Sequence, residues 1–363
     1  DFVGKEVEDI YQLFEVNELS ESNYAYIIDS QDYNIPAVTY DLLNNEVFTS
    51  ASFKPFTIQT LTGTKSFNYG SLLIPLSVQK KLNSDELYEK MKSIQKKYDV
   101  NIYSVESGLS SSGVDLGSGY VMPLNKPSAM MLIGTGVSSY EAGEVWHLLD
   151  QRVGMPITKV PMRNFDNISM DKYNVLVLVS GNYKFSDNQI EKIKTWAENG
   201  NTIISIGSGS KLLIDKKIVD ENLLEKEESN AMNYIAYGDA TENRGKEQIG
   251  GVILNSIIDL SHPLAFGYEN NSLPLYKNNS IWLKPSKNNY SSVVRYSENS
   301  LIDGFLTENN KAKIKESVSL VVSRVGRGIA VMFADNPNFR GAWYGTNRLF
   351  LNAILLGDKI YIP

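Results

Sequence analysis

Short apolar runs alternate with amphipathic stretches through the middle of the chain. Apolar residues fill 130–133, 175–179 and 202–206, and each run ends in a turn rich in glycine and serine. Between the runs, apolar side chains recur at helical spacing, as in residues 187–199. Strands that alternate with helices form crossover units. The pattern therefore predicts a parallel sheet covered by helices, with a site expected where the strands end.

The first third of the chain has a similar pattern. Apolar residues within 24–28, 48–56, 70–75 and 101–106 predict strands, and helices are expected to begin at Pro36 and Ser84. A stretch rich in glycine and serine follows at 107–126. We therefore expect two α/β domains, residues 1–124 and 125–363, each Rossmann-like or flavodoxin-like with three layers and a mainly parallel sheet.

Further segments complete the expected layout. Residues 1–22 are acidic and are expected to form a linker or packing arm, and residues 212–230 a charged helical insertion. More strands are expected at 250–254, 293–294, 317–322 and 328–333, followed by an amphipathic helix at 340–356. The sequence begins with Asp1 rather than methionine, so we expect it to be a piece of a longer protein.

Composition narrows the classes of function. The chain has 363 residues and a net charge of −7, which argues against nucleic acid as the main partner because phosphate binding needs a basic face. No apolar run approaches the roughly 20 residues that a membrane-spanning helix needs. The chain contains no cysteine, which excludes disulfides, zinc sites built on thiolates and a cysteine nucleophile.

Metal ligation is the first candidate chemistry. The two histidines are His147 and His262, whereas zinc peptidase sites need several ligands at fixed spacing. His147 and Asp150 stand three residues apart and would be neighbours on a helix, but the flanking Trp146 marks that helix as a packing element. His262 precedes Pro263 and is expected to bond to nearby backbone. We therefore expect no metal site and no cofactor in this chain.

A serine nucleophile is the second candidate. Residues 203–211 place a glycine-rich turn after a predicted strand, which is where class I glutamine amidotransferase-like folds carry a cysteine nucleophile. That position falls at Gly207 or Ser208. Ser208 would need a base within hydrogen-bond reach, and His262 with Asp259 would complete a triad. This arrangement predicts a serine-dependent amidase or esterase, and the alternative is a plain turn at the end of a buried strand.

Ligand binding at the strand ends is the third candidate. The turn at Gly134 and Gly136 lies between a strand and a helix, as in a dinucleotide-binding loop, but Ser139 replaces the third glycine of that pattern. The candidate ligand-binding residues belong to the turns and the helices after them: Gly134, Gly136, Glu144, Gly181, Gly207 and Ser208. They predict a small-ligand or glycan-binding module. The aromatic segment 336–344 is a further candidate, as a sugar- or peptide-binding edge.

Four segments of the chain resemble a known family. Residues 136–151, 173–178, 259–268 and 333–340 are similar to the C-terminal region of large bacterial zinc carboxypeptidases, the carboxypeptidase A-like metallopeptidases. In such proteins a zinc peptidase domain precedes a glutamine amidotransferase-like domain, so the resemblance implies that residues 125–363 have the latter fold. The family's zinc motif, a histidine and a glutamate three apart with a distant histidine, does not occur in this sequence.

The resemblance implies a non-catalytic accessory region of an exported peptidase. Such a region would support its own upstream peptidase domain, which would carry the zinc, or hold peptide or cell-wall substrate. The resemblance also implies a secreted or periplasmic location. The lack of cysteine and of metal-ligand spacing supports a non-catalytic role independently. The serine hydrolase and the ligand-binding module stay as alternatives.

Overall fold

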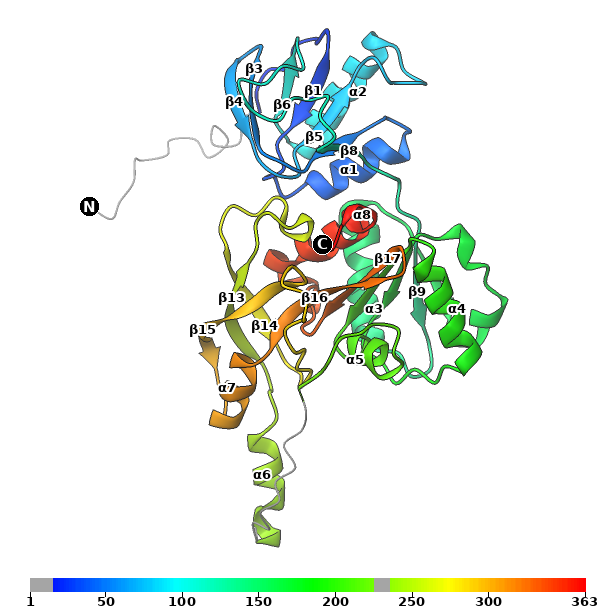
Figure 1. Ribbon diagram of the computed structural model, residues 1–363, viewed down its shortest axis with the longest axis vertical. Coiled ribbons are helices and arrows are strands. Elements are labelled where there is room, and N and C mark those ends of the chain that lie inside the picture. The colour runs from blue at the N-terminus through cyan, green and yellow to red at the C-terminus, as the bar shows by residue number, and fades with distance from the viewer. Residues whose placement is uncertain (1–15, 225–235) are drawn as a thin grey trace, which may run out of the picture. The chain divides into compact units, whose positions relative to one another are not determined.

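The computed structural model describes residues 16–224 and 236–363 (Figure 1). The predicted arm at 1–22 and the predicted insertion at 212–230 therefore lie partly outside the described residues. The chain divides into two compact units, of which the first ends at Asn125 and the second begins at Lys126. This division falls one residue beyond the position expected from the sequence.

The first unit is built on antiparallel sheets. A five-stranded sheet has the order β6-β1-β5-β2-β8, and each pair of neighbours in it is antiparallel. A three-stranded antiparallel sheet has the order β4-β3-β7. The strands are β1 (Ala25–Ile28), β2 (Ser50–Ser52), β3 (Phe56–Thr60), β4 (Gly63–Phe67), β5 (Leu72–Pro75), β6 (Ile102–Val105), β7 (Ser112–Gly113) and β8 (Val121–Pro123).

The mainly parallel sheet expected for the first unit is therefore wrong. Parallel neighbours need a crossover connection of a dozen or more residues, usually with a helix. The described part of this unit has α1 (Ile35–Asn44) and α2 (Ser84–Tyr98) as its α-helices, too few for crossovers between so many strands. Direct turns join other strands, as at Leu61 and Thr62 between β3 and β4. Short apolar runs predicted the strands but not their directions.

Apolar side chains from both sheets form the core of the first unit. The rings of Phe56 and Phe67 stack with centroids 5.2 Å apart, and Ile27, Leu73 and Val105 pack in the same cluster. The five-stranded sheet supplies the last three residues and the three-stranded sheet the two rings, so the core ties the two sheets together.

The second unit contains a nine-stranded sheet of mixed direction, ordered β10-β9-β11-β12-β17-β16-β15-β13-β14. The first five strands of that order are parallel, and each later strand is antiparallel to the one before. The strands are β9 (Ala129–Ile133), β10 (Ile157–Pro161), β11 (Val175–Leu178), β12 (Thr202–Ile206), β13 (Val252–Ile258), β14 (Ser272–Lys277), β15 (Ser292–Gly304), β16 (Val318–Val325) and β17 (Gly328–Phe333).

The α/β class expected for residues 125–363 is confirmed, but the sheet is only half parallel. The apolar runs that became β9, β11 and β12 are buried along almost their whole length, as central parallel strands are. The antiparallel half arises because hairpins join consecutive strands, as where Val325 pairs with Gly328 across a two-residue turn. The pattern of apolar runs does not distinguish a hairpin from a crossover.

Helices cover both faces of this sheet (Figure 1). On one face lie α4 (Asp187–Glu198) and α5 (Ser208–Asp215), where Trp196 and Leu213 share a core with Met332 of β17. On the other lie α3 (Ser139–Trp146), which continues as a π-helix over His147–Val153, and α8 (Asn347–Leu356). The ring of Phe350 in α8 lies 6.5 Å from that of Phe333. The remaining α-helices of the described part are α6 (Ala240–Lys246) and α7 (Glu308–Lys315).

A buried ion pair joins the two halves of the sheet. The Lys277 ammonium lies 2.9 Å from the Asp335 carboxylate, and their side chains are 0% and 5% exposed. The second carboxylate oxygen of Asp335 accepts hydrogen bonds from Tyr296 (2.6 Å) and Ser319 (2.7 Å). Burial lowers the pKa of Lys277, and the charge of Asp335 opposes that shift. Each charge therefore depends on the other to stay buried.

The position of this pair shows that the sheet curls. Lys277 ends β14 and Asp335 follows β17, and three strands stand between β14 and β17 in the sheet order. In a flat sheet, with strands about 4.8 Å apart, these two strands would be separated by about 19 Å. The contact at 2.9 Å requires the antiparallel half of the sheet to turn back toward β17.

Replacing one partner of the pair is expected to be costly. Asp335→Asn keeps the acceptor for Tyr296 and Ser319 but leaves a buried, unpaired ammonium, so we expect the free energy of unfolding to fall by about 3–5 kcal/mol. Adding Lys277→Met should recover at least half of that loss. Urea unfolding of both variants measures this. Lys211→Met, at an exposed pair with Asp215, is the control, with an expected change below about 0.5 kcal/mol. A double variant no more stable than Asp335→Asn would contradict the prediction.

Candidate functional site

The carboxyl ends of β9, β11, β12 and β17 lie at one edge of the sheet, because these strands are parallel. The chain leaves β9 through α3 toward β10, and leaves β11 through α4 toward β12. The order therefore reverses between β9 and β11, and α3 and α4 cover opposite faces. In open α/β sheets, ligands bind in the crevice at such a switch point. Here the crevice would lie between the turns at 134–138 and 180–182.

The crevice between these two turns is closed by backbone. Val137 and Gly181 form an antiparallel bridge, and the Asn182 amide donates to the Gly136 carbonyl at 2.6 Å. A Cβ on Gly136 would lie 2.7 Å from the Asn182 carbonyl oxygen, and one on Gly181 would lie 2.7 Å from the Gly136 carbonyl oxygen. Gly136 and Gly181, predicted as ligand-binding residues, thus allow the two turns to touch. Gly134, in the same turn, is exposed and lines a pocket beside α3.

The turn after β12 has the backbone shape of a nucleophile elbow. Gly207 adopts φ 55° and ψ −120° between β12 and α5, and a sharp, strained turn from strand to helix is where hydrolases of α/β fold hold the nucleophile. A Cβ at Gly207 would lie 2.3 Å from the Ser180 hydroxyl oxygen. That hydroxyl accepts a hydrogen bond from the Ser208 amide and donates one to the Ile206 carbonyl. The space of a nucleophilic side chain is therefore occupied.

Ser208, the sequence-predicted nucleophile, lies one residue past the elbow. Its hydroxyl accepts from the Gly181 amide (2.8 Å) and donates to the Gly181 carbonyl (3.2 Å). Both bonds hold α5 to the turn after β11, so the hydroxyl serves to join two strand ends.

The structure does not bring Ser208 and His262 together. His262 follows β13, which runs antiparallel to β12 because three antiparallel pairings separate β13 from β17. The loop after β13 is therefore at the opposite edge of the sheet from the elbow. Asp259 accepts hydrogen bonds from the amide and hydroxyl of Ser261 rather than orienting the imidazole. The expected triad fails because the sequence does not reveal the direction of β13.

His262 instead stabilises a turn. Its Nδ1 atom accepts a hydrogen bond from the Leu264 amide (3.2 Å), and the Asn352 side chain of α8 donates to the carbonyls of Leu264 and Phe266. Burial lowers the pKa of His262 to about 4. The imidazole is therefore neutral at pH 7, as an acceptor at Nδ1 must be.

Two carboxylates on α3 also bind neighbouring loops. Glu141 accepts a hydrogen bond from the Ser180 amide (2.7 Å). Glu144, a predicted ligand-binding residue, accepts from the Asn336 side chain (2.5 Å) and the Arg340 amide (2.6 Å). Burial raises the pKa of both carboxyls above the usual range. Ser180 and Glu141 were not among the residues predicted from the sequence. Glu141 could have been found from its spacing to Glu144, because residues three apart lie on one side of a helix.

The expected absence of a metal site stays a prediction. His147 is exposed on the π-helix, and Asp150, three residues later on that helix, is exposed as well. Within residues 16–224 and 236–363, no group of three or more histidine, aspartate and glutamate side chains could hold a metal ion. In the same ranges no helix is long and apolar enough to cross a membrane.

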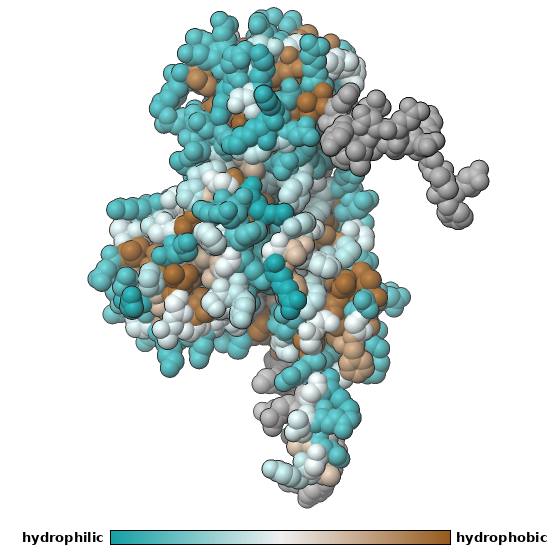
Figure 2. Space-filling view, turned by 180° about the vertical axis from the view of Figure 1, so that it is seen from behind, coloured by the Kyte–Doolittle hydropathy of each residue, from teal (hydrophilic) through white to brown (hydrophobic). Residues whose placement is uncertain are grey.

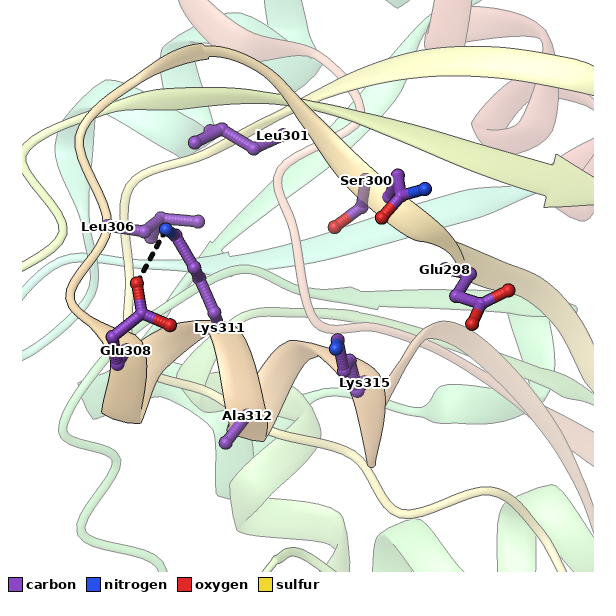
Figure 3. A pocket seen from close by; sticks show the side chains of 9 residues that line it. Glu298, Ser300, Leu301, Leu306, Glu308, Lys311, Ala312 and Lys315 are labelled. Atoms are coloured by element: carbon purple, nitrogen blue, oxygen red, sulfur yellow. Dashed lines mark hydrogen bonds and ion pairs between the residues drawn. The ribbon is translucent and has the colours of Figure 1, made fainter.

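A cleft of about 410 Å³ lies between β15 and α7 (Figure 3). Glu308 and Lys311, both on α7, form an ion pair there at 2.7 Å. Glu298 of β15 and Lys315 of α7 also line the cleft, so charges of both signs border it. A surface ion pair of this kind contributes little stability, and the sequence analysis did not single out the cleft.

The comparisons with known proteins give matches among solved structures. No protein family matches the chain, and no curated protein matches it. Solved structures with similarity include a putative ThuA-like protein from Parabacteroides merdae, at 14% identity over 64% of this chain and 90% of that chain, with a TM-score of 0.42. A putative GMP synthase subunit from Thermoplasma acidophilum has 11% identity over 63% and 92% of the two chains, with a TM-score of 0.37.

A glutamine amidotransferase from Thermotoga maritima is also similar, with 9% identity over 58% of this chain and 76% of that chain and a TM-score of 0.34. Glutamine amidotransferase-like and ThuA-like folds are thus among the structural neighbours. None of the three is a zinc carboxypeptidase by name, so the resemblance to that family stays a prediction.

A side chain at the elbow is expected to destabilise the protein. Gly207→Ala should cost about 2–4 kcal/mol of unfolding free energy, because backbone strain adds to the contact with Ser180. In a Ser180→Ala background, which removes the contacting oxygen, the cost should be smaller by at least about 1 kcal/mol. Gly154→Ala, at φ 71° with open space around its Cβ, is a control for strain alone. Denaturant unfolding provides the values, and additive costs would contradict the proposed contact.

The buried histidine is expected to make stability depend on pH. The unfolded chain binds a proton at the ordinary histidine pKa of 6.5, and the folded protein only near 4, so stability falls as pH falls from about 6.5 toward 4. The loss should be about 1–2 kcal/mol, because His262 is partly exposed. His262→Asn should remove this part of the slope, and His147→Asn is the matched control. Equal slopes for the parent protein and His262→Asn would refute the assignment.

Proposed function

We propose that this chain is a non-catalytic α/β region that accompanies a zinc carboxypeptidase domain. The observation that carries the non-catalytic part is the elbow at Gly207, where the Ser180 hydroxyl occupies the space of a nucleophile. The zinc would belong to the upstream peptidase domain, with no cofactor in this chain. The shape of the elbow also supports a glutamine amidotransferase-like origin for the second unit.

The accessory role rests on the sequence resemblance. The partner would be the upstream peptidase domain of the same protein, in a secreted or periplasmic location, and the region would support that domain or hold its peptide or cell-wall substrate. Figure 2 shows several separate apolar patches on one side of the second unit. The exposed apolar side chains of the second unit include Ile302, which is 53% exposed, and Phe305, which is 67% exposed. Such side chains offer apolar surface for docking.

Two other functions are compatible with the sequence. A serine-dependent amidase or esterase would need Ser208 and His262 in contact, and these residues lie at opposite edges of the sheet. A small-ligand or glycan-binding module is the better second candidate. Its site would lie beside the contact of Gly136 with Gly181, because backbone fills the space between these two residues.

A hydrolysis assay tests the non-catalytic assignment. The purified chain is expected to release no product above background from p-nitrophenyl esters, glutamine amides or peptides, with zinc or with a chelator. Ser208→Ala and His262→Asn should give the same background rate. Metal-independent hydrolysis that Ser208→Ala abolishes would overturn the proposal.

The gene that encodes the chain tests the accessory role. The coding sequence upstream of Asp1 is expected to encode a peptidase domain with two histidines and a glutamate as zinc ligands. Removing residues 1–363 from that protein should lower kcat/KM for long peptides and leave short blocked dipeptides unchanged, because an accessory region contacts substrate away from the scissile bond. An upstream sequence without such a domain would refute the accessory role.

A further inference from the structure

A pocket of about 300 Å³ opens on the α3 side of the sheet, beside its β10 edge. Met131 and Ile133 of β9 and Ala142 of α3 line it with apolar surface. The ring of Trp146 forms another part of the wall. This volume is at the lower end of the range for small-molecule sites, and a mainly apolar lining is typical of them. Gly134, Val137 and Ser138 of the turn after β9 also line the pocket, so it lies next to the backbone contact at Gly136 and Gly181.

A glycine in the middle of α3 keeps this pocket open. Gly143 lines the pocket, and a Cβ built on it would meet no atom within 4 Å. Glycine inside a helix costs about 1 kcal/mol relative to alanine, and here neither backbone conformation nor packing requires it. Because Gly143 has no side chain, the pocket beside this face of α3 stays unfilled.

Trp146 lies three residues after Gly143, where the helix type changes. Trp146 is the last residue of α3, and a π-helix begins at His147. The wider π turn changes the angle between successive side chains, and such turns occur often at functional sites. Residues three apart are neighbours on a helix surface, and the partly exposed Trp146 ring lines the pocket beside Gly143.

Lys159 is the charged residue of the pocket lining. It pairs with Met131 in the register between β10 and β9, so the two side chains lie on the same face of the sheet. Its ammonium lies 4.7 Å from the centroid of the Trp146 ring. No carboxylate of the described residues forms an ion pair with Lys159. The pocket thus combines an apolar interior, an aromatic face and an uncompensated cation.

We propose that this pocket binds a small carboxylate with a flat or branched apolar body. The apolar walls fit the body, and Lys159 fits a single negative charge at the mouth. A phosphate is less suited, because its two charges call for more than one cation, and Lys159 is the one cationic residue of the lining. This inference goes beyond the proposed accessory function and does not depend on a peptidase partner.

Binding can be followed by NMR of the tryptophan indole N–H groups. The chain has four tryptophans, and Trp146→Phe identifies the signal of Trp146. Titration with phenylacetate or indole-3-acetate is expected to shift that signal in a saturable way. Phenylacetamide, of nearly equal shape but neutral, should bind at least fivefold more weakly, because it lacks the charge that Lys159 attracts.

Two variants separate the parts of the proposed site. Gly143→Leu places a side chain in the pocket, from a Cβ position that meets no atom within 4 Å, and leucine favours the helix, so it should abolish the shift while thermal stability stays equal or rises. Lys159→Gln should weaken phenylacetate about fivefold or more and remove its advantage over phenylacetamide. Lys172→Gln, at another exposed lysine of the second unit, is the matched control and should leave both affinities unchanged.

Several outcomes would overturn the proposal. One is the absence of a saturable shift up to about 10 mM ligand, a concentration at which binding worth only a few kcal/mol is detectable. Another is binding that survives Gly143→Leu. Equal affinity for the acid and the amide would refute the carboxylate class. Tighter binding of phenyl phosphate than of phenylacetate would assign the pocket to phosphates instead. Each readout is an affinity, so failure here is distinguishable from failure of the proposed function.

Discussion

The second unit depends on a close approach of backbone at the carboxyl edge of its parallel strands. The turns after β9 and β11 touch at Gly136 and Gly181, where a Cβ would lie within 2.7 Å of a carbonyl oxygen. The Ser180 hydroxyl then fills the inside of the turn after β12. These contacts satisfy backbone groups that would otherwise face a ligand or water. The edge that holds the site in many α/β proteins is here part of the packed structure.

This packing fills the space between the turns after β9 and β11 and leaves the pocket beside α3 open. Backbone fills that space, whereas the pocket, which Gly134 and Gly143 line, stays open. Glu141 and Glu144 fix α3 to the loops after β11 and β17, so the helix that forms the pocket wall is held from its other side. A rigid helix with an unfilled face is a suitable support for a small binding site.

Sequence reasoning found the strands of the second unit but not the contacts between them. The runs at 130–133, 175–179 and 202–206 were predictable because a strand buried on both faces is a continuous apolar run. Strand direction was not, because a hairpin and a crossover give the same local pattern, and this error produced the expected triad with His262. The elbow at Gly207 was placed from its glycine-rich turn. Its contact with Ser180, in the turn after β11, depends on tertiary packing that local spacing does not encode.

The buried pair of Lys277 and Asp335 has a consequence for how the second unit folds. The pair connects the end of the antiparallel half with the last parallel strand, and either charge left alone in the interior is strongly unfavourable. Detachment of the antiparallel half would expose the apolar surface beneath the pair, and would leave without its partner either charge that stayed in the interior. Partial opening is therefore suppressed, and the parallel and antiparallel halves form one cooperative unit whose slowest hydrogen exchange should extend from β12 to β16.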